Sequence, residues 1–408
     1  MDVFVARQPI FNKQQRVFGY ELLYRLAGQD RYDFHDGDRA TSELIANSFI
    51  LIGLEALTGG KRAFINFTRN LLLTDTAFIL PKDLVAIEIL ETIEVDGHVV
   101  DACRKLKQEG YLIVLDDFMF KPRFEPLVQL ADIIKVDFKK TAIEQRIEFV
   151  RKARNDKASF LAEKVETREE FEEALSMGYS FFQGYFFSKP VVVQGRDLSG
   201  YKLNYFHILQ EVNRPDADFE QIERIIKRDV ALSYKLLKYI NSAAYGFRTK
   251  ISSIKHALVM LGMQEVKKWV SLIILRGMGA DKPDEIMISS VVRARFGELT
   301  APFVGMSDRS ADLFLMGIFS MIDALLDYPL SSIIDELPIS DDIKGALLGQ
   351  DSCYLDVFQL LISYEKGDWN SFSRFAAKLG LEEAKVPELF ISSVEWANRF
   401  LDLERGVL

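Results

Sequence analysis

Cysteine is scarce in this sequence, and the scarcity excludes two kinds of stabilisation. The 408 residues include two cysteines, Cys103 and Cys353, which lie far apart. Two distant cysteines give neither a disulfide framework nor a thiolate metal site, and this favours a reducing compartment.

Long apolar runs and an excess of basic charge are also lacking. The longest apolar stretches, such as residues 270–275, are far shorter than a membrane span, and the first residues do not resemble a secretory signal. The net charge of -9 argues against duplex nucleic acid as the main partner, although local lysines and arginines can still hold a small anion. We therefore expect a soluble, cytoplasmic protein with no membrane partner.

The first half of the chain alternates strand-like and helical patterns. Residues 3–11 and 17–24 predict an opening hairpin, and residues 39–57 have a helical pattern that ends at two glycines. Charged amphipathic segments such as 99–109 and 168–177 separate most of the later strands. The further predicted strands are residues 62–67, 84–90, 111–118, 131–137, 160–165 and 179–187. Such alternation is typical of a parallel sheet, open or closed.

Nearly every predicted strand carries a polar residue within its apolar run. In a (β/α) barrel the carboxyl ends of all strands meet at one mouth, whereas an open sheet gathers its ligand from two or three strands. Each residue taken singly also fits a capping or edge position. Taken together they favour a TIM-like barrel with a metal site at its mouth. The residues are Glu21, Asn66, Glu88, Asp116, Asp117, Lys135, Glu163 and Gln183.

From about residue 201 the strand patterns stop and helical periodicity takes over. Residues 191–200 contain two glycines and several polar residues, which indicates a linker. The predicted fold class is therefore α/β followed by all-α, with a barrel domain over residues 1–196 and a helical domain over residues 197–408.

The first half resembles the EAL family of bacterial cyclic di-GMP phosphodiesterases, whose motifs occur in order over nearly all of residues 1–190. The family's Glu-Ala-Leu-Leu-Arg, for example, has the counterpart Glu21-Leu22-Leu23-Tyr24-Arg25. The other matching segments are Gln8-Pro9-Ile10, Ile65-Asn66-Phe67-Thr68, Glu88-Ile89-Leu90-Glu91, Asp116-Asp117-Phe118, Ile134-Lys135-Val136-Asp137, Ala162-Glu163-Lys164-Val165-Glu166-Thr167 and Gln183-Gly184-Tyr185.

The resemblance implies a site with two Mg²⁺ or Mn²⁺ ions. The implied ligands of the first ion are Glu21, Asn66, Glu88 and Asp116, with Asp116 shared with a second ion that Asp117 also binds. Glu163 would be the general base or a ligand of the second ion, Lys135 would orient the attacking water, and Gln183 would fix the second ion's water shell. Glu21, Lys135 and Glu163 are thus the implied catalytic residues.

Four further residues receive roles from the resemblance. Gln8, Arg25 and Asp137 would lie in the nucleotide-binding region, with Arg25 contacting the nucleotide. Glu91 would position the loop that follows Phe118. In the family that loop is Gly-x-Gly-x-Ser and takes part in dimerisation, so a homodimer is a further implication.

The sequence departs from the family in that loop. Residues 119–124 contain no glycine and include Pro122, which makes the loop stiffer. Two functions therefore remain open: hydrolysis of cyclic di-GMP to pGpG, which we favour, and binding of cyclic di-GMP without turnover. A scaffold that has lost the ligand is disfavoured, because clustered carboxylates with no cation would only repel one another.

The second half resembles the HDOD family, a helical relative of the HD phosphohydrolases. Its matching segments are residues 237–246, 251–262 and 314–323. The half holds only His207 and His256, neither of them followed by Asp, so it cannot assemble the metal site of an HD hydrolase. We expect a regulatory module that contacts an unidentified protein partner, with Asn241 and Tyr245 capping and packing a turn.

Overall fold

The computed structural model describes residues 3–26, 54–116, 124–152, 158–188, 208–214, 216–241, 250–279, 282–337 and 339–405. By its internal contacts the chain forms two compact units. The first comprises Met1–Lys189 together with Gln359–Glu395, and the second comprises Pro190–Phe358 together with Trp396–Leu408. The predicted domain boundary after residue 196 stays a prediction. In the structure the C-terminal segment Gln359–Glu395 makes most of its contacts with the barrel unit.

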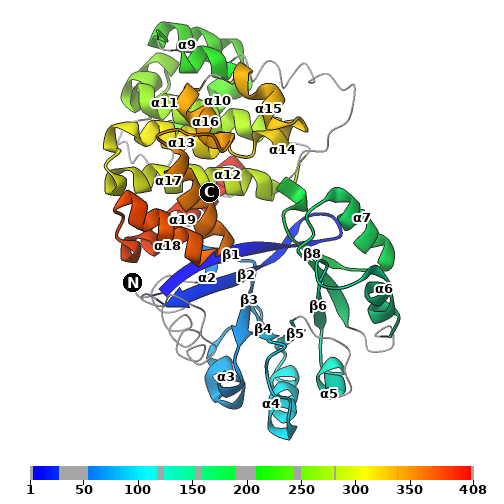
Figure 1. Ribbon diagram of the computed structural model, residues 1–408. Helices are drawn as coiled ribbons and strands as arrows, with labels where there is room; N and C mark the ends of the chain where they lie inside the picture. The colour runs from blue at the N-terminus through cyan, green and yellow to red at the C-terminus, as the bar shows by residue number, and fades with distance from the viewer. Residues whose placement is uncertain are drawn as a thin grey trace. The chain divides into compact units, whose positions relative to one another are not determined.

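The strands of the first unit close into an eight-stranded barrel in sequence order, which confirms the predicted fold class (Figure 1). The strands are β1 (Val3–Asn12), β2 (Val17–Leu26), β3 (Arg62–Phe67), β4 (Val85–Ile89), β5 (Leu112–Leu115), β6 (Ile133–Asp137), β7 (Ser159–Glu163) and β8 (Phe181–Gln183). The predicted hairpin is present, because β1 pairs antiparallel with β2. Strand β1 also closes the barrel by pairing antiparallel with β8, while successive strands from β2 to β8 pair parallel.

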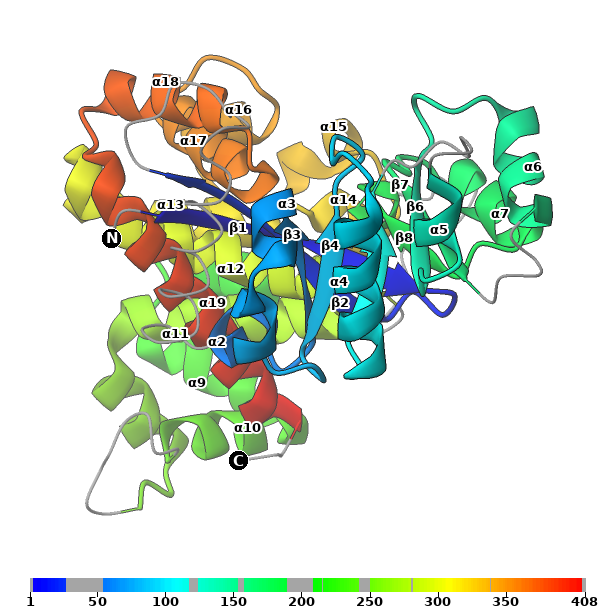
Figure 2. The same ribbon diagram turned by 90° about the horizontal axis from the view of Figure 1, so that it is seen from below.

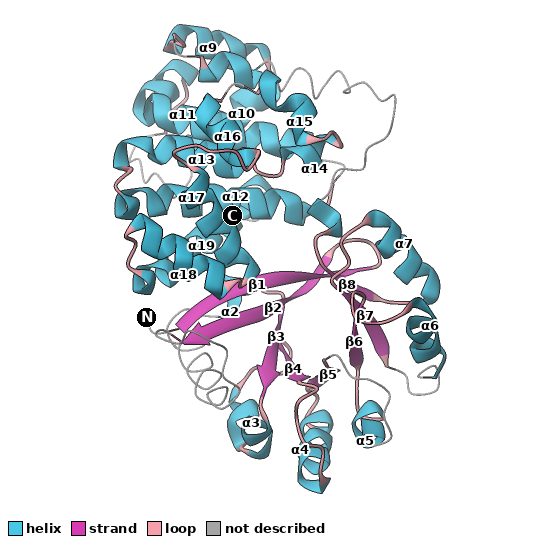
Figure 3. Ribbon diagram, in the orientation of Figure 1, coloured by secondary structure: helices cyan, strands magenta, loops and turns pink. Residues whose placement is uncertain are grey.

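Helices connect the parallel strands on the outside of the barrel, as parallel connections require. Figure 2 shows α3 and α4 in front of β3 and β4, and Figure 3 separates the strands from the helices by colour. The helical segments of this part are α2 (Leu54–Thr58), α3 (Arg69–Leu73), η3 (Asp75–Ile79), α4 (Gly97–Gln108), α5 (Glu125–Val128), α6 (Ile143–Lys152), α7 (Arg168–Met177) and η6 (Phe186–Ser188).

Local sequence explains where these helices begin and end. Helix α7 starts with a capping box, in which the Thr167 side chain accepts from the Glu170 amide and the Glu170 side chain accepts from the Thr167 amide. It ends at Gly178, whose φ of 104° suits a left-handed cap. Helix α4 begins likewise at Asp96, which accepts a hydrogen bond from the Val99 amide at 2.9 Å.

An apolar layer fills the barrel and supports the polar residues above it. Its members come from six strands and are almost fully buried: Ile10, Phe64, Ala86, Val114, Ile133 and Leu161. Successive side chains of a strand point to opposite faces, so the residue two positions along faces inward as well. That position holds Gln8, Asn66, Glu88, Asp116, Lys135 and Glu163, respectively. The predicted site residues therefore form the next layer toward the mouth.

The last predicted strand is shorter than expected. Strand β8 covers only Phe181–Gln183, and residues 186–188 form a 3-10 helix instead. The chain turns at Gly184, where the Gln183 carbonyl accepts from the Val165 amide and the Phe186 amide donates to the Val165 carbonyl. Of the helix expected at residues 39–57, only its end, within α2, lies among the described residues, and the expected linker at 191–200 lies outside them.

The described part of the second unit contains helices and no strands. Helix α11 is interrupted at Gly262, whose backbone angles are not helical. Helices α17 and α19 run across the division between the units. The helices of the second unit, together with the two that cross the division, are α9 (Phe219–Arg228), α10 (Val230–Ile240), α11 (Ile254–Met278), α12 (Asp284–Thr300), α13 (Ser310–Phe319), α14 (Ile322–Leu326), α15 (Leu330–Ile333), α16 (Asp341–Leu347), α17 (Leu355–Lys366) and α19 (Val386–Arg405), with 3-10 turns η7 (Ala301–Val304), η8 (Ser307–Arg309) and η9 (Ile334–Glu336). Helix α18 (Trp369–Leu379) and the 3-10 turn η10 (Glu383–Lys385) belong to the first unit.

Asn241 holds the turn that follows α10. Its side-chain amide donates to the carbonyls of Leu237 and Ile251, each at 2.7 Å, and its oxygen accepts from the Ile251 amide at 2.8 Å. This is the capping role expected for it, whereas Tyr245 lies outside the described residues. No helix within the described ranges is both long and apolar enough to cross a membrane.

Gly184 provides a test of this packing. A Cβ at this position would lie 2.1 Å from the Val165 carbonyl oxygen and 2.5 Å from the Val165 nitrogen, and the φ of 143° also disfavours a side chain. Backbone cannot yield as a side chain can, so we expect Gly184→Ala to lower the free energy of unfolding by about 3 kcal/mol or more.

The matched control is Gly60→Ala, where φ is 74° and a Cβ would meet nothing within 4 Å. It should cost only about 1 kcal/mol, from the left-handed backbone alone. Urea unfolding followed by circular dichroism measures both variants. Equal losses would contradict the close approach of Val165 to Gly184.

Candidate metal and nucleotide site

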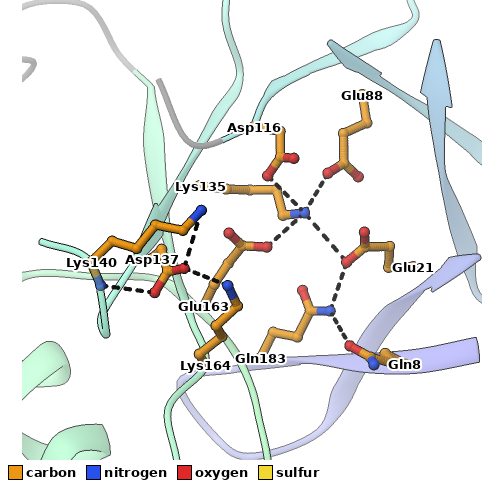
Figure 4. Close-up of polar contacts among 10 residues, drawn as sticks. All are labelled: Gln8, Glu21, Glu88, Asp116, Lys135, Asp137, Lys140, Glu163, Lys164 and Gln183. Carbon is orange, nitrogen blue, oxygen red and sulfur yellow. Dashed lines mark hydrogen bonds and ion pairs between the residues drawn. The ribbon is translucent and has the colours of Figure 1, made fainter. Parts of the chain in front are cut away.

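The Lys135 ammonium group lies at the centre of the site, surrounded by four carboxylates (Figure 4). Its Nζ atom is 2.8 Å from Glu163 Oε1, 3.2 Å from Asp116 Oδ1 and 3.3 Å from Glu21 Oε2, and it also contacts Glu88 Oε1. Lys135 is 1% exposed and Glu88 is fully buried. Five strands thus deliver one charged side chain each to a single point, as the sequence predicted for the mouth of a barrel.

A chain of amide hydrogen bonds extends the site to the barrel's closing strands. Gln183 Nε2 donates to Glu21 Oε2 at 2.7 Å and to Gln8 Oε1 at 3.1 Å. Gln8 and Glu21 are direct partners in the β1–β2 ladder, so their side chains share the inner face. Gln183 therefore positions the Glu21 carboxylate and links it to β1.

Burial shifts the acid–base behaviour of the cluster. Loss of solvation raises the pKa of Glu88 well above its usual range and raises the pKa of Glu163 to about 8, in each case against the opposing pull of Lys135. Burial by itself would lower the pKa of Lys135, but the surrounding carboxylates raise it overall. Burial therefore favours the neutral forms of Glu88 and Glu163, and a cation bound beside them would lower the pKa of both carboxyls and release protons.

The donor set suits a hard divalent cation. Oxygen ligands are those that Mg²⁺ and Mn²⁺ prefer, and the cluster supplies four carboxylates. Among the described residues, Glu88 Oε2 and Gln183 Oε1 are buried and accept no hydrogen bond. Within those ranges no three His, Cys, Asp or Glu side chains are already arranged to hold a metal ion. The four carboxylates contact the Lys135 ammonium instead. A bound cation would share these oxygens with the ammonium group.

Of two other predicted metal ligands, the structure describes Asn66 but not Asp117. Asn66 is 9% exposed and pairs with Glu88 in the β3–β4 ladder, which places it in the same polar layer. Its main-chain carbonyl accepts from the Tyr24 hydroxyl at 3.1 Å, which joins β2 to β3. Asp117 lies outside the described residues, as do residues 117–123 of the glycine-free loop.

Three residues expected to bind the nucleotide or position the loop lie outside the polar cluster. Asp137 accepts from the amides of Lys139 and Lys140 and pairs with Lys164 at 2.5 Å, so it anchors the loop after β6 (Figure 4). Arg25, at the end of β2, pairs with Glu383 at 2.6 Å. Glu91 is exposed, and the loop it was expected to position is not among the described residues.

Sequence reasoning missed the C-terminal contributions to this region. Gln8 Nε2 donates to the Lys366 carbonyl at 3.2 Å, and Arg25 is held by Ser373 and Glu383. These partners lie about 350 residues from Arg25 in the chain, so no local sequence pattern predicts the contact. Glu383 by itself looks like any other charged residue near a helix end. The pairing of Asp137 with Lys164 was also missed, because Lys164 reads as an ordinary surface lysine.

Two family models match the sequence. The EAL domain model matches residues 49–190 and the HDOD domain model matches residues 202–326. The EAL match begins after Glu21 and Arg25, yet the structure places Glu21 with the carboxylates from the matched range. Neither match reaches the C-terminal segment Gln359–Glu395.

Two curated relatives match nearly the whole chain. YuxH, an uncharacterised protein of Bacillus subtilis, is 39% identical over 98% of this chain and 100% of its own length. CdgJ, a cyclic di-GMP phosphodiesterase of Vibrio cholerae, is 35% identical over 97% of this chain and 92% of its own length. Among solved structures, an EAL domain protein from Listeria monocytogenes is 22% identical, with a TM-score of 0.37, over 46% of this chain and 87% of the other.

Full-length similarity to two proteins, with an EAL and an HDOD match in the same order, defines the relationship. The chain belongs to the family of EAL–HDOD proteins that includes YuxH and CdgJ.

Proposed function

We propose that this protein hydrolyses cyclic di-GMP to linear pGpG at the mouth of the barrel, with Mg²⁺ or Mn²⁺ as cofactor. The observation that carries the proposal is the buried cluster of Glu21, Glu88, Asp116 and Glu163 around Lys135. The relative CdgJ, named for this activity, supports the choice of substrate.

The cluster and its neighbours divide the chemical tasks. Glu21, Asn66, Glu88 and Asp116 would hold the metal, with Asp117 and Glu163 completing a second position. Divalent cations at such a site supply Lewis acidity at phosphorus and a water that is nucleophilic near neutral pH. Glu163 would accept the proton of the attacking water. Burial raises the pKa of its carboxyl to about 8, so this role requires the bound cation to favour the ionised form. Lys135 would offset the charge on the phosphoryl oxygens.

Binding of cyclic di-GMP without turnover is the alternative. The glycine-free sequence at residues 119–124 favours it, because that loop replaces the flexible one expected next to the second metal position. In either case the helical half would contact a protein partner whose state depends on the ligand. The two functions differ in one measurable product, pGpG.

Turnover is tested by incubating the purified protein with cyclic di-GMP and Mg²⁺ or Mn²⁺ and separating pGpG by chromatography. Glu163→Gln should lower kcat by about 10²- to 10⁴-fold, because a general base is lost. Glu21→Ala and Asp116→Asn should abolish product while leaving the circular dichroism spectrum intact.

The matched control is Glu172→Gln on α7, where Glu172 pairs with Arg168 at 2.9 Å and is 61% exposed. This variant should retain wild-type turnover. Micromolar binding of cyclic di-GMP with no product from the wild type would reject the hydrolase and leave the receptor function.

Lys135 allows metal binding to be tested without any turnover. In Lys135→Met the four carboxylates lose the ammonium group that lies among them, so we expect the free energy of unfolding to fall by about 3–5 kcal/mol in a chelator. Mn²⁺ should then raise the melting temperature of this variant more than that of the wild type, because the cation replaces the missing charge.

Lys164→Met is the control, since Lys164 is 54% exposed and pairs with Asp137 outside the cluster. Its melting temperature should respond to Mn²⁺ as the wild type does. Differential scanning fluorimetry measures all three proteins. A response to Mn²⁺ that is equal in Lys135→Met and the wild type would contradict a cation site among these carboxylates.

A further inference from the structure

The C-terminal segment Gln359–Glu395, here called the C-terminal cap, packs against one face of the β1–β2 hairpin within the first unit. In the hairpin register Gln8 pairs with Glu21, Ala6 with Leu23 and Phe4 with Arg25. Directly paired residues share a face, and so do residues two positions apart. The face that carries Glu21 inside the barrel therefore continues toward the mouth as Leu23, Arg25 and Phe4.

Aromatic residues anchor the C-terminal cap to this face. The Phe4 ring lies 5.8 Å from Phe372, 6.1 Å from Trp369 and 6.5 Å from Tyr364, measured between ring centroids. Phe4, Tyr364 and Phe372 are at most 1% exposed. Figures 1 and 2 both show α18 beside the start of β1. Burial of three large rings makes this a stable attachment.

Arg25 forms a polar contact with the cap, here called the latch. Its Nη2 atom pairs with Glu383 Oε2 at 2.6 Å, and its Nη1 atom donates to Ser373 Oγ at 2.9 Å. The guanidinium also lies over the Phe4 ring at 4.7 Å and near the Trp369 ring at 5.6 Å. Both terminal nitrogens of Arg25 thus have partners in the cap.

The latch is weaker than the anchor. Glu383 is 34% exposed, so water screens its pairing with Arg25, whereas the anchoring rings are excluded from water. A ligand phosphate binds an arginine fork at least as well as a carboxylate does. The latch can therefore open while the aromatic anchor remains in place.

The cap also reaches the proposed metal centre. The Lys366 carbonyl accepts from Gln8 Nε2, Gln8 accepts from Gln183, and Gln183 donates to Glu21. Next to Lys366, Gly367 lies so close to Leu23 that a Cβ on it would be 2.8 Å from Leu23 Cδ1. Arg25 lies only about 13 Å along β2 from Glu21, so a dinucleotide with one phosphate on the carboxylate cluster is long enough to reach this part of the mouth.

We propose that the C-terminal cap is autoinhibitory and competes with the cyclic dinucleotide for Arg25 and the adjoining mouth of the barrel. The inference rests on the proposed function, because it takes that dinucleotide as the ligand. Glu383 supplies the negative charge that the ligand's phosphate replaces. A protein partner that breaks the contact between the cap and Arg25 would then raise the affinity of the site for the dinucleotide.

The test measures binding of a non-hydrolysable phosphorothioate analogue of cyclic di-GMP to the full-length protein with Mn²⁺, by isothermal titration calorimetry. Glu383→Gln should lower Kd about fivefold, because Arg25 loses a charged partner. Ser373→Asp should raise Kd by a similar factor, because it adds a carboxylate next to Arg25. Opposite directions in two variants separate the latch from a general loss of folding, which melting temperatures monitor.

Glu382→Gln is the matched control, since the neighbouring Glu382 pairs with Lys385 at 3.1 Å and is 66% exposed. Its Kd should equal that of the wild type. Hydrogen exchange gives a second readout: the analogue should speed exchange of amides in residues 366–383, because the coupling is reciprocal.

The outcomes distinguish the two proposals. Equal Kd values in all four proteins, with unchanged exchange in residues 366–383, would overturn the autoinhibitory cap while leaving the proposed function in place. Absence of analogue binding in every protein, the Glu383→Gln variant included, would overturn the proposed function and the cap together.

Discussion

One ion-pair network, the Lys135 ammonium with the carboxylates of Glu21, Glu88, Asp116 and Glu163, constrains the rest of the barrel. Four clustered carboxylates without a cation would repel one another, and those that are buried, Glu21 and Glu88, would also lose their hydration, which costs several kcal/mol for each ion. The strands must therefore bring all five side chains to one point. Because clustering these carboxylates costs folding free energy, the arrangement is better explained by a function than by a contribution to stability.

The barrel meets this demand through a simple periodicity. An apolar layer made by Ile10, Phe64, Ala86, Val114, Ile133 and Leu161 fixes the strands against one another. The polar layer stands two residues closer to the mouth than the apolar layer, so the packing of the first layer sets the geometry of the second. Gln183 and Gln8 then tie the Glu21 carboxylate to the strands that close the barrel. Rigid backbone supplies the preorganisation that metal binding and phosphoryl chemistry require.

The C-terminal cap connects this site to the end of the chain. Its aromatic residues are buried against Phe4, while its polar contact with Arg25 through Glu383 is partly exposed. A strong attachment beside a weak one allows local opening without loss of the fold. The cap lies outside the ranges matched by the EAL and HDOD models, yet it belongs to the same compact unit as the barrel. Control of the site through this segment would need no change in the carboxylates themselves.

The sequence by itself determined the barrel, the helical second half and most members of the polar cluster, because strand periodicity and the alternation of strand and helix are local properties. The strand predicted at residues 179–187 was too long, because β8 ends at Gln183, where Val165 closely approaches Gly184. Only the tertiary structure decided that Lys135 contacts four carboxylates at once, since that contact depends on how the barrel closes. It also placed Arg25 against Glu383 and Ser373. Contacts between residues about 350 positions apart arise from packing of buried aromatic side chains, which no local pattern encodes.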